Sequence, residues 1–163
     1  MGKKGFTIIE LLVVIAIIGL LASFGMSNLI RARAKGKAAK AISELDAIRT
    51  AAELYVSDNG DYPPDVDRDI PPGIESYLAP GQWPEGPWNG SVYDWDNWND
   101  GEIIQVTLRM CPISGTCNPP FKDWTRYSSM YYCITGNCVP HESYPDDPGW
   151  CVNCPGSKMP DLN

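Results

Sequence analysis

The stretch Gly5-Phe6-Thr7-Ile8-Ile9-Glu10-Leu11 decides the fold, because it places one carboxylate in an apolar run that continues to residue 26. About 20 apolar residues are enough to cross a bilayer as a helix. A charged side chain at the centre of such a helix costs roughly 2.5–3.5 kcal/mol. Glu10 lies nearer the end of the run, where the cost is smaller, and Lys3 and Lys4 are almost two turns away. The sequence therefore predicts that the partner of Glu10 comes from another molecule.

Behind its short basic leader, this pattern resembles the class III signal of type IV pilins and pseudopilins. In that family a prepilin peptidase cuts after the glycine and methylates the new amino terminus, while the apolar helix stays attached. The resemblance implies cleavage between Gly5 and Phe6, N-methylation of Phe6, and pairing of Glu10 with the freed Phe6 amine of a neighbouring subunit. Gly5 suits the cut because it has no Cβ, and the ion pair would mainly set the register of docking.

Two simpler interpretations of this segment remain. A secretory signal peptide also begins with lysines and an apolar core, but it ends in a small-x-small site, and Leu20-Leu21-Ala22 fits that poorly. A plain membrane anchor explains the length of the run and leaves Glu10 unexplained. The positive-inside rule, applied to the basic residues from Arg31 to Lys40, would put the head in the cytoplasm; the leader and the cysteines argue for the opposite side.

The apolar pattern predicts one long helix followed by a head of different composition. Small or apolar residues recur every three or four positions from Ala34 to Val56, which is typical of a helix with one buried face. After Gly60, proline, glycine, aspartate and tryptophan dominate. The predicted division is a leader (1–5), a helix (6–57, with 6–26 as membrane span and filament core and 27–57 amphipathic) and a head (58–163, with loops at 58–90, a sheet at 91–135 and a cysteine-rich tail at 136–163).

The expected fold class is α+β, a type IV pilin fold in which the long N-terminal helix packs against a small antiparallel sheet. Strands are predicted at 91–95, 102–110 and 125–135. In the middle strand, Ile104, Val106 and Leu108 alternate with polar residues, which predicts a sheet with one covered face. A short helix is predicted at Ile74–Leu78.

The head is acidic. Sixteen of the twenty acidic side chains but only five of the thirteen basic ones follow residue 53. This charge argues against nucleic-acid binding, which needs cations opposite the phosphates. The turn Asn99-Asp100-Gly101 lies in a stretch rich in oxygen ligands, so calcium is a candidate cofactor and a solvated turn is the alternative. The candidate calcium ligands are Asp94, Asp96, Asn99 and Asp100.

Six cysteines fall in the last third of the chain, which in an extracellular protein is typical of disulfides with fifteen possible connectivities. Zinc is the alternative, because Cys151-x-x-Cys154 has ligand spacing. We favour three disulfides that staple the loop-rich tail. The candidates are Cys111, Cys117, Cys133, Cys138, Cys151 and Cys154.

No catalytic motif is found, so the chain is predicted not to be an enzyme. The expected function is that of a pilus subunit that polymerises with its own copies, served by the prepilin peptidase, a platform protein and an assembly ATPase. It would lie in the cytoplasmic membrane as a precursor and then on the cell surface. The alternatives are a pseudopilin of type II secretion and a membrane-anchored binding domain in which the head's tryptophans act. Asn89-Gly90-Ser91 is a formal glycosylation sequon.

Overall fold

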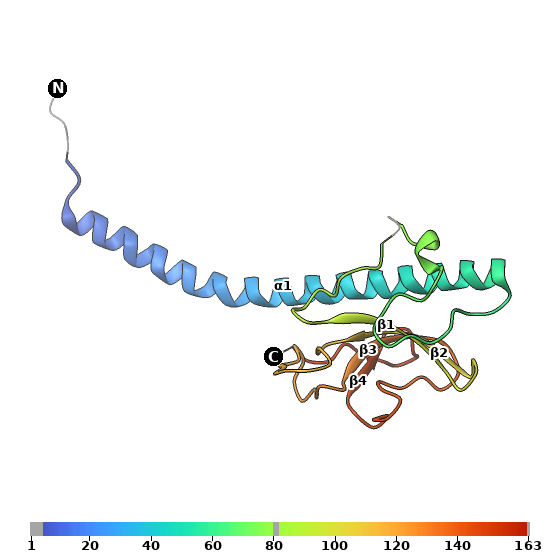
Figure 1. Cartoon of the computed structure of the whole chain (residues 1–163). Coiled ribbons are helices and arrows are strands. Elements are labelled where there is room, and N and C mark those ends of the chain that lie inside the picture. The colour runs from blue at the N-terminus through green and yellow to red at the C-terminus, as the bar shows by residue number, and fades with distance from the viewer. Residues whose placement is uncertain (1–4, 80–81, 163) are drawn as a thin grey trace. The chain divides into compact units, whose positions relative to one another are not determined.

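The computed structural model describes residues 5–79 and 82–162, apart from the side chains of residues 23–28. The predicted leader, except Gly5, lies outside these residues. The chain divides into two compact units, and the boundary falls inside the long helix, between Gly36 and Lys37. Figure 1 shows the elements in chain order: α1 (Ile8–Asn59), the 3-10 helix η1 (Ile74–Tyr77), β1 (Val92–Trp98), β2 (Ile103–Arg109), β3 (Ser129–Thr135) and β4 (Gly149–Cys151). The α+β fold class is confirmed.

The first unit holds the apolar part of α1, whose large side chains are uncovered. Phe6 is 84% exposed, Ile8 79% and Leu21 64%. A continuous apolar surface of this kind marks a site for lipid or for partner helices. Among the described residues, no helix is both long and apolar enough to cross a membrane. The span predicted at 6–26 includes residues 23–26, whose side chains lie outside the description.

The second unit opens with the rest of α1, which buries one stripe of its surface. Ala41, Leu45, Ile48 and Ala52 are fully buried and belong to one core with the sheet. Their spacing of three and four residues is that of one helical face, so the predicted stripe is confirmed. Small alanines on this face allow close approach, and the sheet contributes the larger side chains, among them the fully buried Trp95.

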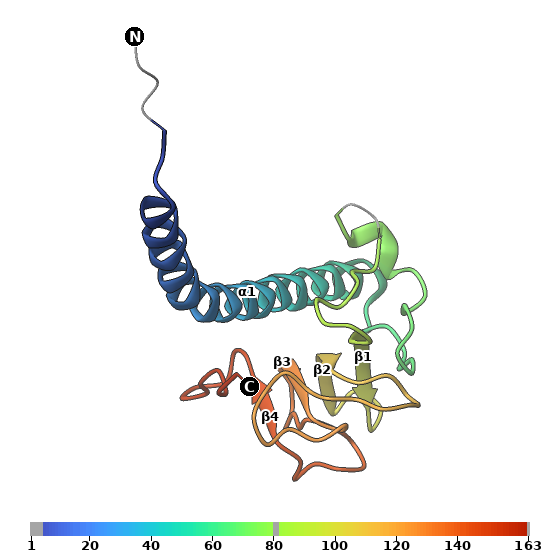
Figure 2. The same ribbon diagram turned by 90° about the vertical axis from the view of Figure 1, so that its left-hand side faces the viewer.

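The sheet has four strands among the described residues, in the order β1-β2-β3-β4, as Figure 2 shows from the side. The first three strands pair antiparallel, and β4 pairs parallel with β3. The expectation of a purely antiparallel sheet is therefore wrong for its last strand. The chain must cross over between β3 and β4, and a parallel pair needs a connection of about a dozen residues. Residues 136–148 of the predicted tail supply it.

The first strand is longer than predicted, because Asp96, Asn97 and Trp98 continue the ladder with β2. The predicted turn follows them: Asn99, Asp100 and Gly101 all have positive φ values of 54°, 55° and 91°. Asparagine, aspartate and glycine are the residues that accept this left-handed conformation most readily. The turn prediction is thus confirmed, and only the end of the strand was misplaced.

Both faces of the sheet are covered, although the sequence predicted one. Ile104, Val106 and Leu108 belong to the apolar core that includes the buried face of α1. The alternate residues of β2 are also buried: Gln105 and Thr107 are 0% exposed and Arg109 is 5% exposed. Polar side chains buried this deeply need partners, and those partners define the interior of the head.

Candidate functional site

The predicted processing site lies just before α1. Gly5 and Phe6 are exposed, residues 5–7 have no regular structure, and no described atom lies within 4 Å of the place where a Cβ on Gly5 would be. Exposed, irregular backbone is the kind that proteases cleave. Cleavage between Gly5 and Phe6 stays a prediction, and its surroundings leave room for an enzyme.

Thr7 and Glu10 form a reciprocal cap at the start of α1. The Thr7 amide and hydroxyl donate to Glu10 Oε2 at 2.9 and 2.7 Å, and the Glu10 amide donates to Thr7 Oγ1 at 3.3 Å. Such a capping box satisfies amides that the first helical turn leaves unpaired. Glu10 therefore has a neutral hydrogen-bond partner in its own segment, and the charged partner expected from another molecule stays a prediction. Thr7-x-x-Glu10 has the spacing of this motif, so the sequence carried the signal.

All six cysteines form disulfides, as favoured from the sequence. The pairs are Cys111–Cys117, Cys133–Cys138 and Cys151–Cys154. Each joins neighbours along the chain, with sequence separations of 6, 5 and 3. The zinc alternative does not fit, because Cys151 and Cys154 are bonded to each other.

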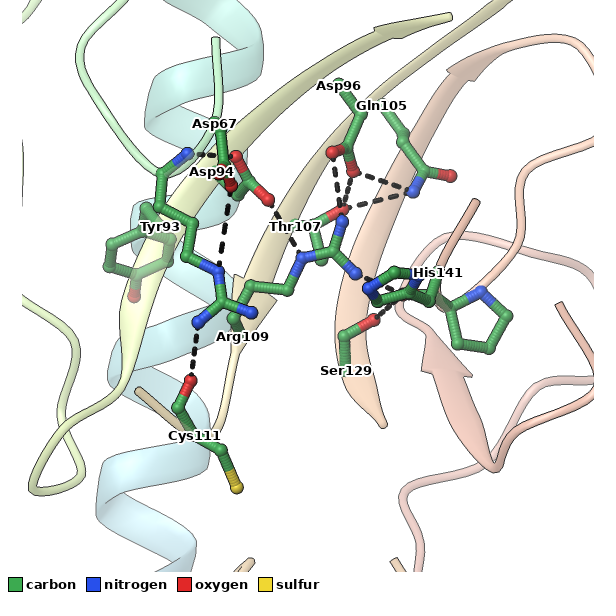
Figure 3. Close-up of polar contacts among 12 residues, drawn as sticks. Asp67, Tyr93, Asp94, Asp96, Gln105, Thr107, Arg109, Cys111, Ser129 and His141 are labelled. Carbon is green, nitrogen blue, oxygen red and sulfur yellow. Dashed lines mark hydrogen bonds and ion pairs between the residues drawn. The ribbon is translucent and has the colours of Figure 1, made fainter. Parts of the chain in front are cut away.

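A buried ion cluster lies on the face of the sheet opposite α1 (Figure 3). Arg109 on β2 donates from Nε to Asp94 Oδ2 at 2.8 Å and from one terminal nitrogen to Asp96 Oδ1 at 3.0 Å. The three side chains are 4–6% exposed. Asp94 also accepts the Arg68 amide at 2.8 Å. A guanidinium presents several donors in a fixed plane, which suits it to hold two carboxylates at once.

The same cluster binds the connection between β3 and β4. The other terminal nitrogen of Arg109 donates to the Pro140 carbonyl at 2.6 Å, and the Ser129 hydroxyl donates to that carbonyl at 2.7 Å. Gln105 donates to the Val139 carbonyl at 2.9 Å and accepts the Val139 amide at 3.2 Å. These bonds cover the second face of the sheet with the tail.

Burial and charge act against each other in this cluster. Burial raises the pKa of Asp96 to about 7, although Arg109 lowers it. Burial lowers the pKa of Arg109, but the two carboxylates outweigh it, so that this pKa lies above its ordinary value. Burial, followed by the positive charges of Arg109 and Arg68, lowers the pKa of His141. The cluster is therefore a structural ion network, and Asp96 is the member whose charged form is least favoured.

The structure does not assemble the predicted calcium ligands. Asp94 and Asp96 point to Arg109, whereas Asn99 and Asp100 lie in the exposed turn. Among the described residues, no group of three or more His, Cys, Asp or Glu is placed to hold a metal ion. β1 runs past Asp96, so the two strand carboxylates serve the ion cluster while the turn lies beyond the end of the strand, and calcium binding stays a prediction. The sequon is also constrained, because the Ser91 hydroxyl is buried and donates to the Trp88 carbonyl at 2.7 Å.

Comparisons with known proteins agree with this arrangement. Residues 1–26 match the family model described as the prokaryotic N-terminal methylation motif. Over 135 residues the chain is 32% identical to the type II secretion system core protein G of Klebsiella michiganensis, covering 76% of this chain and 94% of that protein. The Vibrio cholerae protein of the same name is 32% identical over 64% of this chain and 77% of its own length.

A pilin is also similar. The type IV major pilin protein PilA of Myxococcus xanthus is 41% identical over 60 residues, which cover 37% of this chain and 27% of that protein. No solved structure matches. A methylation motif on a long helix that packs against a small sheet defines the pilin type of subunit. With a similarity that spans almost the whole of a relative, the chain belongs to the type IV pilin and type II secretion pseudopilin family.

Proposed function

We propose that the chain is a structural subunit of a filament, cut after Gly5 by a prepilin peptidase and polymerised through α1. The observation that carries the proposal is the uncovered apolar surface from Phe6 to Leu21, which begins next to an accessible Gly5–Phe6 bond. A monomer that keeps such a surface needs lipid before assembly and sibling helices after it. The proposal includes a membrane-held precursor and, as partners, an assembly platform with its ATPase.

The capping box refines what Glu10 would do in that filament. In the uncut chain its carboxylate is held by Thr7. After cleavage, the Phe6 amine of a neighbouring subunit would compete with Thr7 for the same oxygens, and a charged donor forms a stronger hydrogen bond than a neutral one. The intramolecular cap would thus keep the carboxylate satisfied until the partner arrives.

Two filaments are candidates for the subunit. A surface pilus is supported by the similarity to PilA, which covers only 27% of that protein. A type II secretion pseudopilus is supported by the match to 94% of a core protein G. Because that match includes the head as well as the helix, we favour the pseudopilus between the two. Filaments that reach the medium without overexpression would favour the pilus instead.

Two matched substitutions test the role of Glu10. Glu10→Gln removes the charge but keeps a residue that the capping box also accepts. Thr7→Ala removes the two hydroxyl bonds of the cap but keeps the carboxylate and the bond from the backbone amide of residue 7. Both variants and the wild type are overexpressed in cells with a prepilin peptidase and an assembly platform, so that a pseudopilus as well as a pilus can reach the sheared fraction. Sheared filaments are then quantified, and mass spectrometry checks that the subunit begins at methylated Phe6.

The two variants should separate assembly from helix capping. We expect Glu10→Gln to lose nearly all filaments while Thr7→Ala loses few. If capping were the whole role of Glu10, Thr7→Ala would be the more damaging change. Normal filaments from Glu10→Gln would contradict the proposal, as would a wild-type subunit that never appears in the sheared fraction. A chain that stays monomeric and membrane-bound would instead favour the anchored binding domain.

A further inference from the structure

An acidic cleft of about 570 Å³ lies between α1 and the segment that carries η1. Its apolar lining includes Ile70, Leu78 and Trp83. Three carboxylates line it as well, those of Glu44, Glu75 and Glu85. The volume is within the range of small-ligand sites, roughly 300–1,000 Å³. We call this site the acidic cleft.

Two of the carboxylates have no partner in the described part of the chain. Glu75 and Glu85 take part in no side-chain hydrogen bond or ion pair there. Glu44 differs, because it accepts the Tyr93 hydroxyl at 2.6 Å and pairs with Lys40 at 3.4 Å. The cleft therefore keeps negative charge that the described residues do not neutralise.

The half-exposed side chain of Trp83 gives the cleft a second reason to prefer a cation. Its indole nitrogen donates to the Tyr93 carbonyl at 3.4 Å, and its side chain lines the cleft. The face of an indole attracts cations, and arginine more often than lysine. A guanidinium can stack on a ring and still donate to carboxylates in its own plane. The cleft thus has the chemistry of an arginine site.

The same chain carries arginine and lysine side chains that have no ion-pair partner among the described residues. Arg31, Arg33, Lys35 and Lys37 are exposed on α1, and none forms an ion pair with another described residue. We call residues 31–37 the basic segment. Lys40, the next cation along α1, already pairs with Glu44. Charge complementarity therefore links the acidic cleft to the basic segment.

We propose that the acidic cleft of one subunit receives an arginine, Arg31 or Arg33, from the basic segment of a second copy of this chain. This inference rests on the proposed polymerisation, which brings copies together through their helices. It adds a contact between head and helix to the contact between helices. An apolar helix surface alone allows sliding, whereas one arginine in one cleft selects a single register between neighbours.

Charge reversal in both partners tests the pairing. Glu75→Lys with Glu85→Lys reverses the cleft, and Arg31→Glu with Arg33→Glu reverses the basic segment. The full chain is overexpressed with its assembly machinery, and sheared filaments are quantified. Each reversal should lower filament yield about tenfold, a loss of one decade in an equilibrium constant. The combined chain, in which the charges are exchanged, should recover to within about twofold of wild type.

A matched control changes the same net charge elsewhere on the head. Asp146→Lys with Asp161→Lys alters two exposed carboxylates outside the cleft and should leave the yield unchanged. An equal loss in this control would overturn the proposal, because net charge would then explain it. The proposal would also be overturned if either reversal alone left the filament yield unchanged, or if the combined chain stayed defective.

A photocrosslink identifies the occupant directly. Trp83→benzoylphenylalanine in the full chain should yield a dimer-sized adduct whose crosslinked peptide lies within residues 27–40. An adduct to another peptide or another protein would overturn the assignment. If wild-type filaments form and depend on Glu10 while the reversals have no effect, only this inference fails. If wild type forms no filament, the proposed function fails with it.

Discussion

Arg109→Met should destabilise the head by about 3–5 kcal/mol, the cost of removing one partner from a buried ion pair. The side chains of Asp94 and Asp96 are 5% and 4% exposed and would lose their counter-ion. Methionine has an unbranched chain that fills much of the same space, so the loss would report the charge more than a cavity. The Pro140 carbonyl would lose one of its two donors. This loss adds to the penalty.

Arg49→Met is the matched control. Arg49 also holds two carboxylates, those of Asp46 at 3.0 Å and Glu53 at 2.6 Å. The arginine side chain is 24% exposed and its partners about half exposed. Ion pairs between residues three or four apart on a helix surface contribute about 0.3–0.5 kcal/mol each, and the contact with the Tyr132 ring adds about 0.5–1 kcal/mol. Arg49→Met should therefore cost about 1–2 kcal/mol.

The assay is urea unfolding of the full, oxidised chain in a non-ionic detergent at pH 8, followed by tryptophan fluorescence. The midpoint should fall much further for Arg109→Met, with an unchanged slope if unfolding stays two-state. Two variants within about 1 kcal/mol of each other, the size of a surface pair, would refute the reasoning. If Arg109→Met does not fold, Arg109→Lys keeps the charge and loses the planar fork. It should then still be less stable than the Arg49→Met control, because a single ammonium cannot reproduce the bonds to Asp94, Asp96 and the Pro140 carbonyl.

Two further predictions concern the same unit. The pKa of Asp96 is raised from 3.8 to about 7 in the folded protein. The contribution of Asp96 to the free energy of unfolding is therefore fully present below about pH 4 and is lost as the pH rises through 7. Relative to Asp96→Asn, the wild-type free energy of unfolding should fall between these values in a urea series, and parallel curves would contradict this. Gly136→Ala should lower the melting temperature more than Gly115→Ala. Both glycines have positive φ, 81° and 96°, but a Cβ would meet the β1–β2 turn backbone only at Gly136. Equal shifts in calorimetry would argue against that contact.

The sequence predicted the parts of the fold that repeat a local period. The stripe through Ala41, Leu45 and Ile48 follows the helix repeat, and Asn99-Asp100-Gly101 is turn chemistry that works without tertiary help. The N-terminal pattern also predicted the family. These features are encoded within a few residues of one another, so no knowledge of the rest of the chain is needed.

The second face of the sheet could not be predicted in this way. Alternation of Gln105, Thr107 and Arg109 with apolar residues is the pattern of a strand with one solvated face. What buries these residues is the connection at residues 139–141, more than 30 positions away in the chain. Opposite charges on Asp94, Asp96 and Arg109 gave a hint of cross-strand pairing. They could not show that the pairs lie inside the protein.

The disulfides do a different task from the one expected. A bond that closes a loop of only 3–6 residues removes about 2 kcal/mol of chain entropy from the unfolded state in the entropic account. None of the three crosses from the tail to β1 or β2. The tail is instead attached by β4, which pairs with β3, and by the bonds of Gln105 and Arg109 to residues 139 and 140. Two of the disulfides, Cys133–Cys138 and Cys151–Cys154, close the turns at which these attachments begin and end. The ion cluster thus decides where the tail lies on the sheet, and the disulfides limit how far its loops can move from there.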